Sequence, residues 1–107
     1  RVGCDIVHLE RFKKSLERTP SLVKKVFLEG EKAGSTESLA GIFAAKEAVL
    51  KALEMKAGDW ENIEIRKTKS GRPEVSISNF NKHVIGQDIS ISHDGNYAFA
   101  VAVFLFE

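Results

Sequence analysis

The amino-acid sequence predicts an α+β fold for its 107 residues, which are few enough for a single domain over residues 1–107. The opening residues RVGCDIV are apolar enough to form a short buried strand. Helical spacing then dominates about half of the chain, and alternating apolar and polar residues dominate the remainder. A strand followed by helices and then by several strands is the order of an α+β protein, with one long central helix before a mostly antiparallel sheet.

The helical part divides into three sections. The apolar residues of HLERFKKSLER, residues 8–18, recur at helical spacing, and Pro20 interrupts the pattern. Short helical pieces follow. Ser35 is a good N-cap for the long helix, which we expect to continue to about Lys56 and to be closed by Gly58.

The remaining residues predict two hairpins. IEIRKT and EVSIS flank the turn KSGRP, and ISISH and YAFAVAVFLF flank the tight turn DGN. The last strand carries Ala98, Ala100 and Ala102 on one face and larger apolar side chains on the other. Because the long helix also has an alanine-rich face, we expect its backbone to approach this strand closely. A strand that is apolar on both faces must be covered on both, which suggests that a second chain supplies part of the cover.

Composition limits the classes of function. Hydrophobic residues at 43% and charged residues at 29% are ordinary for a globular protein. The single cysteine, Cys4, excludes an internal disulfide and fits a reducing, cytoplasmic location. No apolar run approaches the roughly 20 residues of a membrane span, so we expect no membrane partner.

Charge is distributed unevenly along the chain. Residues 8–25 contain six basic and two acidic side chains, and residues 66–72 contain four basic side chains and no acid. Such runs are either solvated faces or two surfaces that bind anions.

The stretch FAAKEAVLKAL contains the strongest chemical signal. It places Lys46 within the apolar arc of the long helix, with Glu47 and Lys51 beside that arc. Glu47 and Lys51 have the spacing of a surface ion pair, and Asp5, inside the first strand, suits a helix cap. A more specific interpretation joins the two acids in one site, because Mg²⁺ binds one or two carboxylates together with substrate phosphates, whose charge lysines neutralise.

Four segments occur in order over nearly the whole chain, namely GCDIVHLERF, FAAKEAVLKAL, WENIEI with SGRPEV, and ISISHDGNYAFA. Together they resemble the characteristic blocks of the holo-acyl-carrier-protein synthases, which are small bacterial 4′-phosphopantetheinyl transferases. The resemblance implies a 4′-phosphopantetheinyl transferase-like fold and a homotrimer with sites between subunits. It also implies Mg²⁺-dependent transfer of 4′-phosphopantetheine from coenzyme A to a serine of apo acyl carrier protein, in fatty acid biosynthesis, with release of adenosine 3′,5′-bisphosphate.

The same resemblance implies roles for individual residues. Asp5 and Glu47 would bind the metal, and Glu47 and Lys51 would act in catalysis. Coenzyme A would be bound by Lys46, Lys51, Gly71, Pro73 and His93, with the alternative that Lys46 braces Glu47 instead of contacting coenzyme A. The carrier protein would dock on Arg11, Lys14 and Arg18. Many members of the family have an arginine where this chain has Ile42, so one phosphate contact is either missing or supplied by Lys32, Arg66 or Arg72.

Two other functions fit parts of the sequence. A nucleic-acid-binding module would use the two basic runs, but aromatic residues make up only 8% of the chain and none lies within residues 66–72 to stack on bases. We therefore expect no nucleic-acid partner. A non-catalytic domain that binds carrier proteins is the second alternative, and it would tolerate loss of Asp5 and Glu47.

Overall fold

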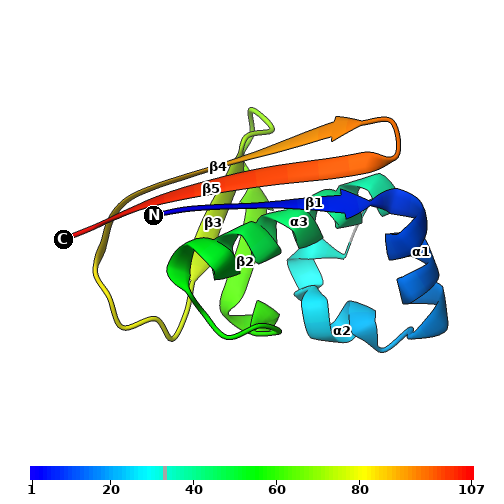
Figure 1. The fold of residues 1–107 in the computed structure, drawn as a ribbon, viewed down its shortest axis with the longest axis horizontal. Coiled ribbons are helices and arrows are strands. Elements are labelled where there is room, and N and C mark those ends of the chain that lie inside the picture. Colours follow the sequence, from blue (N-terminus) through cyan, green and yellow to red (C-terminus); the bar gives the residue numbers. More distant parts are fainter. Residues whose placement is uncertain (33) are drawn as a thin grey trace.

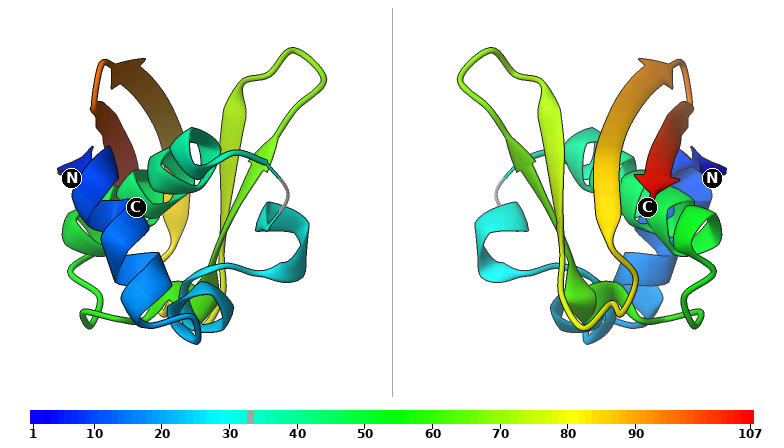
Figure 2. Two further views of the ribbon diagram at one scale, coloured as in Figure 1. Left: turned by 90° about the vertical axis from the view of Figure 1, so that its right-hand side faces the viewer. Right: turned by 90° about the vertical axis from the view of Figure 1, so that its left-hand side faces the viewer.

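The computed structural model describes residues 1–32 and 34–107 and confirms the α+β prediction. A three-stranded antiparallel sheet has the order β1-β5-β4, with β1 at Val2–His8, β5 at Tyr97–Phe106 and β4 at Val84–Asp94. A separate antiparallel hairpin is formed by β2 (Ile63–Lys67) and β3 (Pro73–Ile77). The long helix α3 (Thr36–Leu53) lies between the sheet and the hairpin (Figures 1 and 2).

The shorter helices follow β1 directly. Helix α1 (Leu9–Arg18) lies at the end of the molecule opposite the two chain termini, and α2 (Leu22–Val26) and η1 (Glu29–Glu31) lead back toward α3 (Figure 1). The cap of α1 is His8, whose Nδ1 accepts a hydrogen bond from the backbone N–H of Arg11 at 3.4 Å. The capping role considered for Asp5 is therefore filled by another residue.

Helix α3 begins as predicted and ends earlier than predicted. The side chain of Ser35 caps it by accepting from the N–H of Ser38 at 3.2 Å. Its last residue is Leu53, because Glu54 adopts a left-handed conformation with φ of 55° and its N–H turns back to carbonyls of the last turn. The expectation that the helix reaches Lys56 was wrong, and Gly58 belongs to the turn beyond it.

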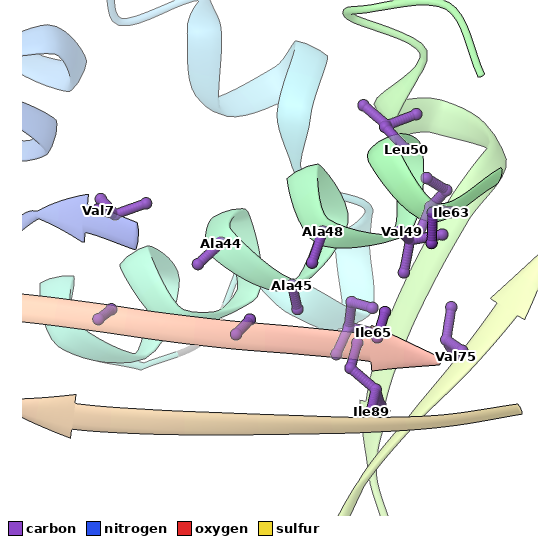
Figure 3. Packing of buried hydrophobic residues seen from close by; sticks show 14 of the residues in the cluster. Val7, Ala44, Ala45, Ala48, Val49, Leu50, Ile63, Ile65, Val75 and Ile89 are labelled. Carbon is purple, nitrogen blue, oxygen red and sulfur yellow. The ribbon is translucent and has the colours of Figure 1, made fainter. Parts of the chain in front are cut away.

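Small residues bring the sheet and α3 together. Ala98, Ala100 and Ala102 of β5 are completely buried, and Figure 3 shows the alanines of α3 beside this strand. Gly3 of β1 lies opposite Ala102 of β5. A Cβ atom placed on Gly3 would lie 2.6 Å from the backbone nitrogen of Ala52 in α3. The predicted close approach is confirmed, and it involves β1 as well as β5.

The outer face of the sheet is apolar and exposed. Val2 and Ile6 of β1 are 67% and 63% exposed, and Val103 and Leu105 of β5 are 40% and 60% exposed. On β4, Asp88 lies opposite Val103 and Ser90 lies opposite Val101, and both are polar, so the apolar surface is confined largely to β1 and β5. Across the described residues, no helix is both long and apolar enough to cross a membrane.

Candidate active site

Asp5 and Glu47 line one cavity, which β1, α1 and α3 enclose. The cavity has a volume of about 530 Å³ and is also lined by Arg11, His8 and Tyr97. Asp5 is presented from the middle of β1, and Glu47 from the middle of α3. The strand and the helix are held together by the packing at Gly3, so the fold brings together the two acids that are 42 positions apart in the sequence.

Lys51 forms an ion pair with Asp5. Its Nζ lies 3.0 Å from Oδ1 of Asp5 and 3.0 Å from the carbonyl oxygen of Cys4. The hydrogen bond that Lys51 donates to the Asp5 carboxylate raises the pKa of Lys51, so its positive charge is retained. No ion pair joins Lys51 to Glu47 within the described chain. The surface pair considered from their spacing on α3 is therefore replaced by the ion pair between Lys51 and Asp5 of β1.

Burial raises the pKa of Glu47, and the neighbouring charge of Asp5 raises it further. The ammonium of Lys51 acts in the opposite direction. A half-buried carboxyl whose ionisation is hindered by a neighbouring carboxylate marks a position that a cation would stabilise. This electrostatic arrangement fits a divalent cation.

The donor set fits Mg²⁺ better than a metal that requires many protein ligands. Among the residues that the structure describes, no group of three or more His, Cys, Asp or Glu side chains could hold a metal ion. Mg²⁺ normally takes one or two carboxylates and completes its coordination with phosphates and water. Asp5 and Glu47 on one cavity wall meet that requirement.

Lys46 does not reach this cavity. Its side chain is fully buried, and Nζ lies 2.6 Å from Oε1 of Glu31 and 2.6 Å from the carbonyl oxygen of Val26. Burial lowers the pKa of Lys46, while the carboxylate of Glu31 opposes that shift. The prediction that Lys46 contacts a phosphate is therefore corrected, because the anion that meets this lysine is an internal carboxylate.

The other residues expected to bind coenzyme A lie elsewhere on the surface. Pro73 lines a second cavity of about 470 Å³ together with Ile42 and Arg66. Gly71 is exposed in the β2–β3 turn, where its φ of 87° requires a glycine-like conformation. His93 is exposed at the end of β4, and its Nε2 lies 2.9 Å from the carbonyl oxygen of Glu37 in the first turn of α3.

Of the three basic residues considered as replacements for an arginine at Ile42, only Arg66 lines the same cavity as Ile42. Lys32 pairs with Glu29 at 2.7 Å, and Arg72 pairs with Asp88 at 2.5 Å.

Three basic residues expected to dock a carrier protein share one face of α1. Arg11, Lys14 and Arg18 are all exposed, and their spacing of three and four residues places them in one row. Arg11 also lines the cavity of Asp5 and Glu47, so this basic face adjoins the acidic site.

The sequence interpretation missed Glu31 and Trp60. Glu31 accepts hydrogen bonds from the N–H groups of Leu28 and Ile65 and pairs with Lys46. A lysine in an apolar helical arc implies a buried acid as its partner, but several acids in the sequence could have filled that role. The ring of Trp60 packs beside that of Phe43, with 6.0 Å between the ring centroids, and nothing in the sequence marks this contact.

Two features point to one class of protein, namely the cavity with its two carboxylates and the long helix packed between a three-stranded sheet and a β-hairpin. A family model for the 4′-phosphopantetheinyl transferase superfamily matches residues 1–102. The chain belongs to this superfamily.

Individual relatives are similar over almost their full length. A holo-[acyl-carrier-protein] synthase of Thermodesulfovibrio yellowstonii is 46% identical, with 95% of each chain covered. One of Salinispora arenicola is 41% identical, covering 95% of this chain and 94% of the relative. Among solved structures, the Helicobacter pylori holo-[acyl-carrier-protein] synthase in complex with coenzyme A superposes with a TM-score of 0.88 at 31% identity, covering 98% of this chain and 100% of that one.

Proposed function

We propose that this chain is a holo-acyl-carrier-protein synthase, which transfers 4′-phosphopantetheine from coenzyme A to a serine of apo acyl carrier protein. The pairing of Asp5 and Glu47 in one cavity, beside Lys51, is the observation that carries the proposal. The named relatives share this activity in their names, and the similar H. pylori structure is a complex with coenzyme A. No observation favours a nucleic-acid-binding or a non-catalytic role.

The reaction joins the serine Oγ to the phosphorus that carries the pantetheine arm and breaks the bond from that phosphorus to the bridging oxygen of the pyrophosphate. Adenosine 3′,5′-bisphosphate leaves, and the serine proton passes to a carboxylate of the site or to water. We assign Asp5 and Glu47 as ligands of Mg²⁺, which when bound would polarise and neutralise the pyrophosphate. Lys51 is well placed to add positive charge, since its flexible side chain is 57% exposed and keeps its proton.

Coenzyme A is proposed to extend from the Asp5–Glu47 cavity to a second one lined by Pro73, near Gly71 and His93. The two cavities share no lining residue within one chain. A site formed between copies of the chain would bring them together. We therefore propose a homotrimer, in which the exposed apolar face of β1 and β5 supplies the contact between subunits.

The basic face of α1 (Arg11, Lys14 and Arg18) is proposed to dock the acyl carrier protein through acidic side chains of that partner. Its position beside the acidic cavity would deliver the acceptor serine to the phosphate. The free thiol of Cys4 fits the reducing conditions of a cytoplasmic enzyme.

Incubation with coenzyme A, Mg²⁺ and apo acyl carrier protein, followed by mass spectrometry of the carrier, tests this function. We expect the carrier to gain one phosphopantetheine group, and we expect a chelator of divalent cations to prevent the gain. A carrier whose acceptor serine is replaced by alanine is the matched control. Failure to modify several different carriers would contradict the proposal.

A further inference from the structure

The carboxylate of Glu31 is buried where three parts of the chain meet. Glu31 is only 2% exposed. Its Oε1 accepts a hydrogen bond of 2.8 Å from the N–H of Leu28, at the start of η1, and lies 2.6 Å from Nζ of Lys46 on α3. Its Oε2 accepts a hydrogen bond of 2.7 Å from the N–H of Ile65 on β2. One side chain therefore links η1, α3 and β2.

The hydrogen bond to Ile65 joins η1 to the outer edge of the β2–β3 hairpin. The hairpin is a two-stranded sheet, so the N–H groups that point away from β3 need acceptors outside it. Ile65 is 4% exposed, and its N–H is bonded to Glu31. The carboxylate thus takes the place that a neighbouring strand would occupy, and it fixes the distance between η1 and β2.

The same three elements form walls of the second cavity, which has a volume of about 470 Å³. Its lining includes Gly30 and Glu31 of η1, Ser38 and Ile42 of α3, and Ile65 and Arg66 of β2. The contacts of Glu31 therefore lie within the wall of this cavity. Because they join η1 to β2 and to α3, they determine how wide the cavity is between those elements.

Lys46 holds the Glu31 carboxylate in place from the interior. Its side chain is completely buried, and Nζ also donates to the carbonyl oxygen of Val26 at 2.6 Å and to that of Trp60 at 3.4 Å. Replacement of a buried ion pair by apolar residues of similar size is often neutral or even stabilising, so such a pair is weak evidence for a purely stabilising role. A buried pair does define one arrangement of the elements that it joins.

We propose that Glu31 is a positioning residue for coenzyme A, whose carboxylate, held by Lys46, keeps η1 and β2 at the separation that admits this substrate to the second cavity. The inference deepens the proposed function and rests on it for the identity of the ligand. Glu31 acts through the backbone of Ile65 and through Lys46, and its own oxygens are occupied by them. Its loss should therefore weaken the binding of coenzyme A and spare that of the carrier protein, whose proposed docking surface is α1.

The link between η1 and β2 is tested without any ligand by Glu31→Gln. Glutamine keeps the length of the side chain but offers one acceptor oxygen in place of two, so the donors of Leu28, Ile65 and Lys46 compete for it. Exchange of the Ile65 amide hydrogen with water, followed by NMR of the ¹⁵N-labelled full chain, should become roughly tenfold faster or more. Glu29→Gln, the same change at an exposed position of η1, is the matched control. Equal exchange at Ile65 in the two variants would overturn the proposal.

The consequence for the substrate is measured by titration calorimetry with coenzyme A and by the two KM values. We expect Glu31→Gln to weaken binding of coenzyme A about tenfold, roughly the effect of one lost hydrogen bond, and to raise the KM for coenzyme A in proportion. The KM for apo acyl carrier protein should stay within about twofold, and Glu29→Gln should change neither value by more than that. A variant that was merely less stable would lower the concentration of active enzyme and leave both KM values unchanged.

A second variant covers a failure of the first to fold. Glu31→Gln leaves the buried ammonium of Lys46 without its counter-charge. If that variant does not fold, the double substitution Glu31→Gln with Lys46→Met, which buries no charge at either position, replaces it in both measurements. The same increases in amide exchange and in the KM for coenzyme A are expected.

The outcomes separate this proposal from the proposed function. If the unaltered protein did not bind coenzyme A, the proposed function would fail, and the role of Glu31 in binding that substrate would fail with it. If coenzyme A bound normally and the Glu31 variant bound it as tightly as Glu29→Gln, the proposed function would stand and the role of Glu31 would fail alone.

Discussion

The ammonium of Lys46 and the carboxylate of Glu31 form a completely buried ion pair, with 2.6 Å between Nζ and Oε1. Each partner has further hydrogen bonds. Lys46 donates to Val26, whereas Glu31 accepts from the N–H groups of Leu28 and Ile65. The pair therefore connects α3 to the segment before it and to the β2–β3 hairpin. Neither Glu31 nor Lys46 lines the cavity of Asp5 and Glu47.

Substitution by methionine should mainly lower the stability of the protein at Lys46 and mainly lower its transfer activity at Lys51. Lys46→Met leaves the buried Glu31 carboxylate without its counter-charge, and breaking such pairs costs about 3–5 kcal/mol of unfolding free energy. Lys51→Met removes an exposed ammonium and should cost less than about 1 kcal/mol, while it reduces transfer activity at least tenfold. Chemical denaturation and a carrier-modification assay measure both effects. Comparable losses of stability in the two variants would contradict the distinction.

The sequence predicted the architecture well because the signals for it are local. Periodicity, the Ser35 cap and the turn residues lie within a few positions of the elements that they determine. The size sorting of the last strand even predicted its close contact with α3. These patterns are sufficient to define the order of strands and helices.

The contacts of Lys46 could not be predicted in the same way. A lysine in an apolar arc can pair either with a phosphate of a ligand or with an acidic side chain of the same protein. Which of the two it meets depends on whether the tertiary fold brings an acidic side chain near. Glu31 is 15 positions away in a segment of short helical pieces, with no periodic pattern to orient it. The end of α3 was missed for a similar reason, because Glu54 is not a residue type that usually adopts φ near 55°.

Glu47→Gln should stabilise the metal-free protein at neutral pH and abolish its activity. Burial and Asp5 raise the pKa of Glu47 in the folded state, so between the ordinary pKa of 4.5 and the raised value the folded state binds more protons than the unfolded state. The free energy of unfolding therefore falls as pH rises through that window, and the cost persists at pH 7.

Glutamine removes this cost because it carries no charge. We expect a melting temperature higher by roughly 2–5 °C at pH 7 in the presence of a chelator, corresponding to about 1 kcal/mol or less. The difference should disappear below pH 4.5, where Glu47 is protonated in both states. Glu37→Gln on the exposed part of α3 is the control, and an unchanged or lower melting temperature for Glu47→Gln at pH 7 would argue against the strained carboxylate pair.

Gly3 should tolerate no side chain. A Cβ atom at this position would lie 2.6 Å from the backbone nitrogen of Ala52 and closer still to the carbonyl oxygen of Ala48, and neither backbone atom can move without separating β1 from α3. Gly3→Ala should therefore lower the unfolding free energy by about 3 kcal/mol or more. Gly30→Ala, where the added Cβ meets no atom within 4 Å, should change it by less than about 1 kcal/mol. Denaturation curves of the two variants that coincide would contradict this packing.

A charge on the outer face of the sheet should prevent assembly. Val103 lies opposite Val2 in the register of β5 and β1, and both are exposed in the single chain. Val103→Lys would place an unpaired ammonium in the proposed subunit contact, so light scattering after size-exclusion chromatography should change from a trimeric to a monomeric mass. Glu74→Lys on the exposed side of β3 should leave the mass unchanged. A Val103→Lys protein that stayed trimeric would exclude this face as the interface.

Reversing a charge on α1 should raise the KM for the carrier protein and leave the KM for coenzyme A nearly unchanged. Lys14 is exposed in the row formed by Arg11, Lys14 and Arg18, but it does not line the cavity of Asp5 and Glu47. Lys14→Glu would place a negative charge opposite the acidic surface proposed for the carrier, and like charges across a binding surface slow association and weaken it. The KM for apo acyl carrier protein should rise about tenfold, whereas the KM for coenzyme A should stay within about twofold.

The salt dependence distinguishes electrostatic docking from a general defect. For the unaltered enzyme, the KM for the carrier should rise as salt is added, because exposed charges more than about 8–10 Å apart are screened at physiological ionic strength. Lys14→Glu should flatten that dependence, since it removes attraction that salt would otherwise screen. Lys82→Glu, an exposed reversal of the same charge on the segment before β4, is the matched control and should leave the KM for the carrier and its salt dependence unchanged. Equal effects of Lys14→Glu on both substrates would instead place Lys14 in the path of catalysis and remove α1 from carrier recognition.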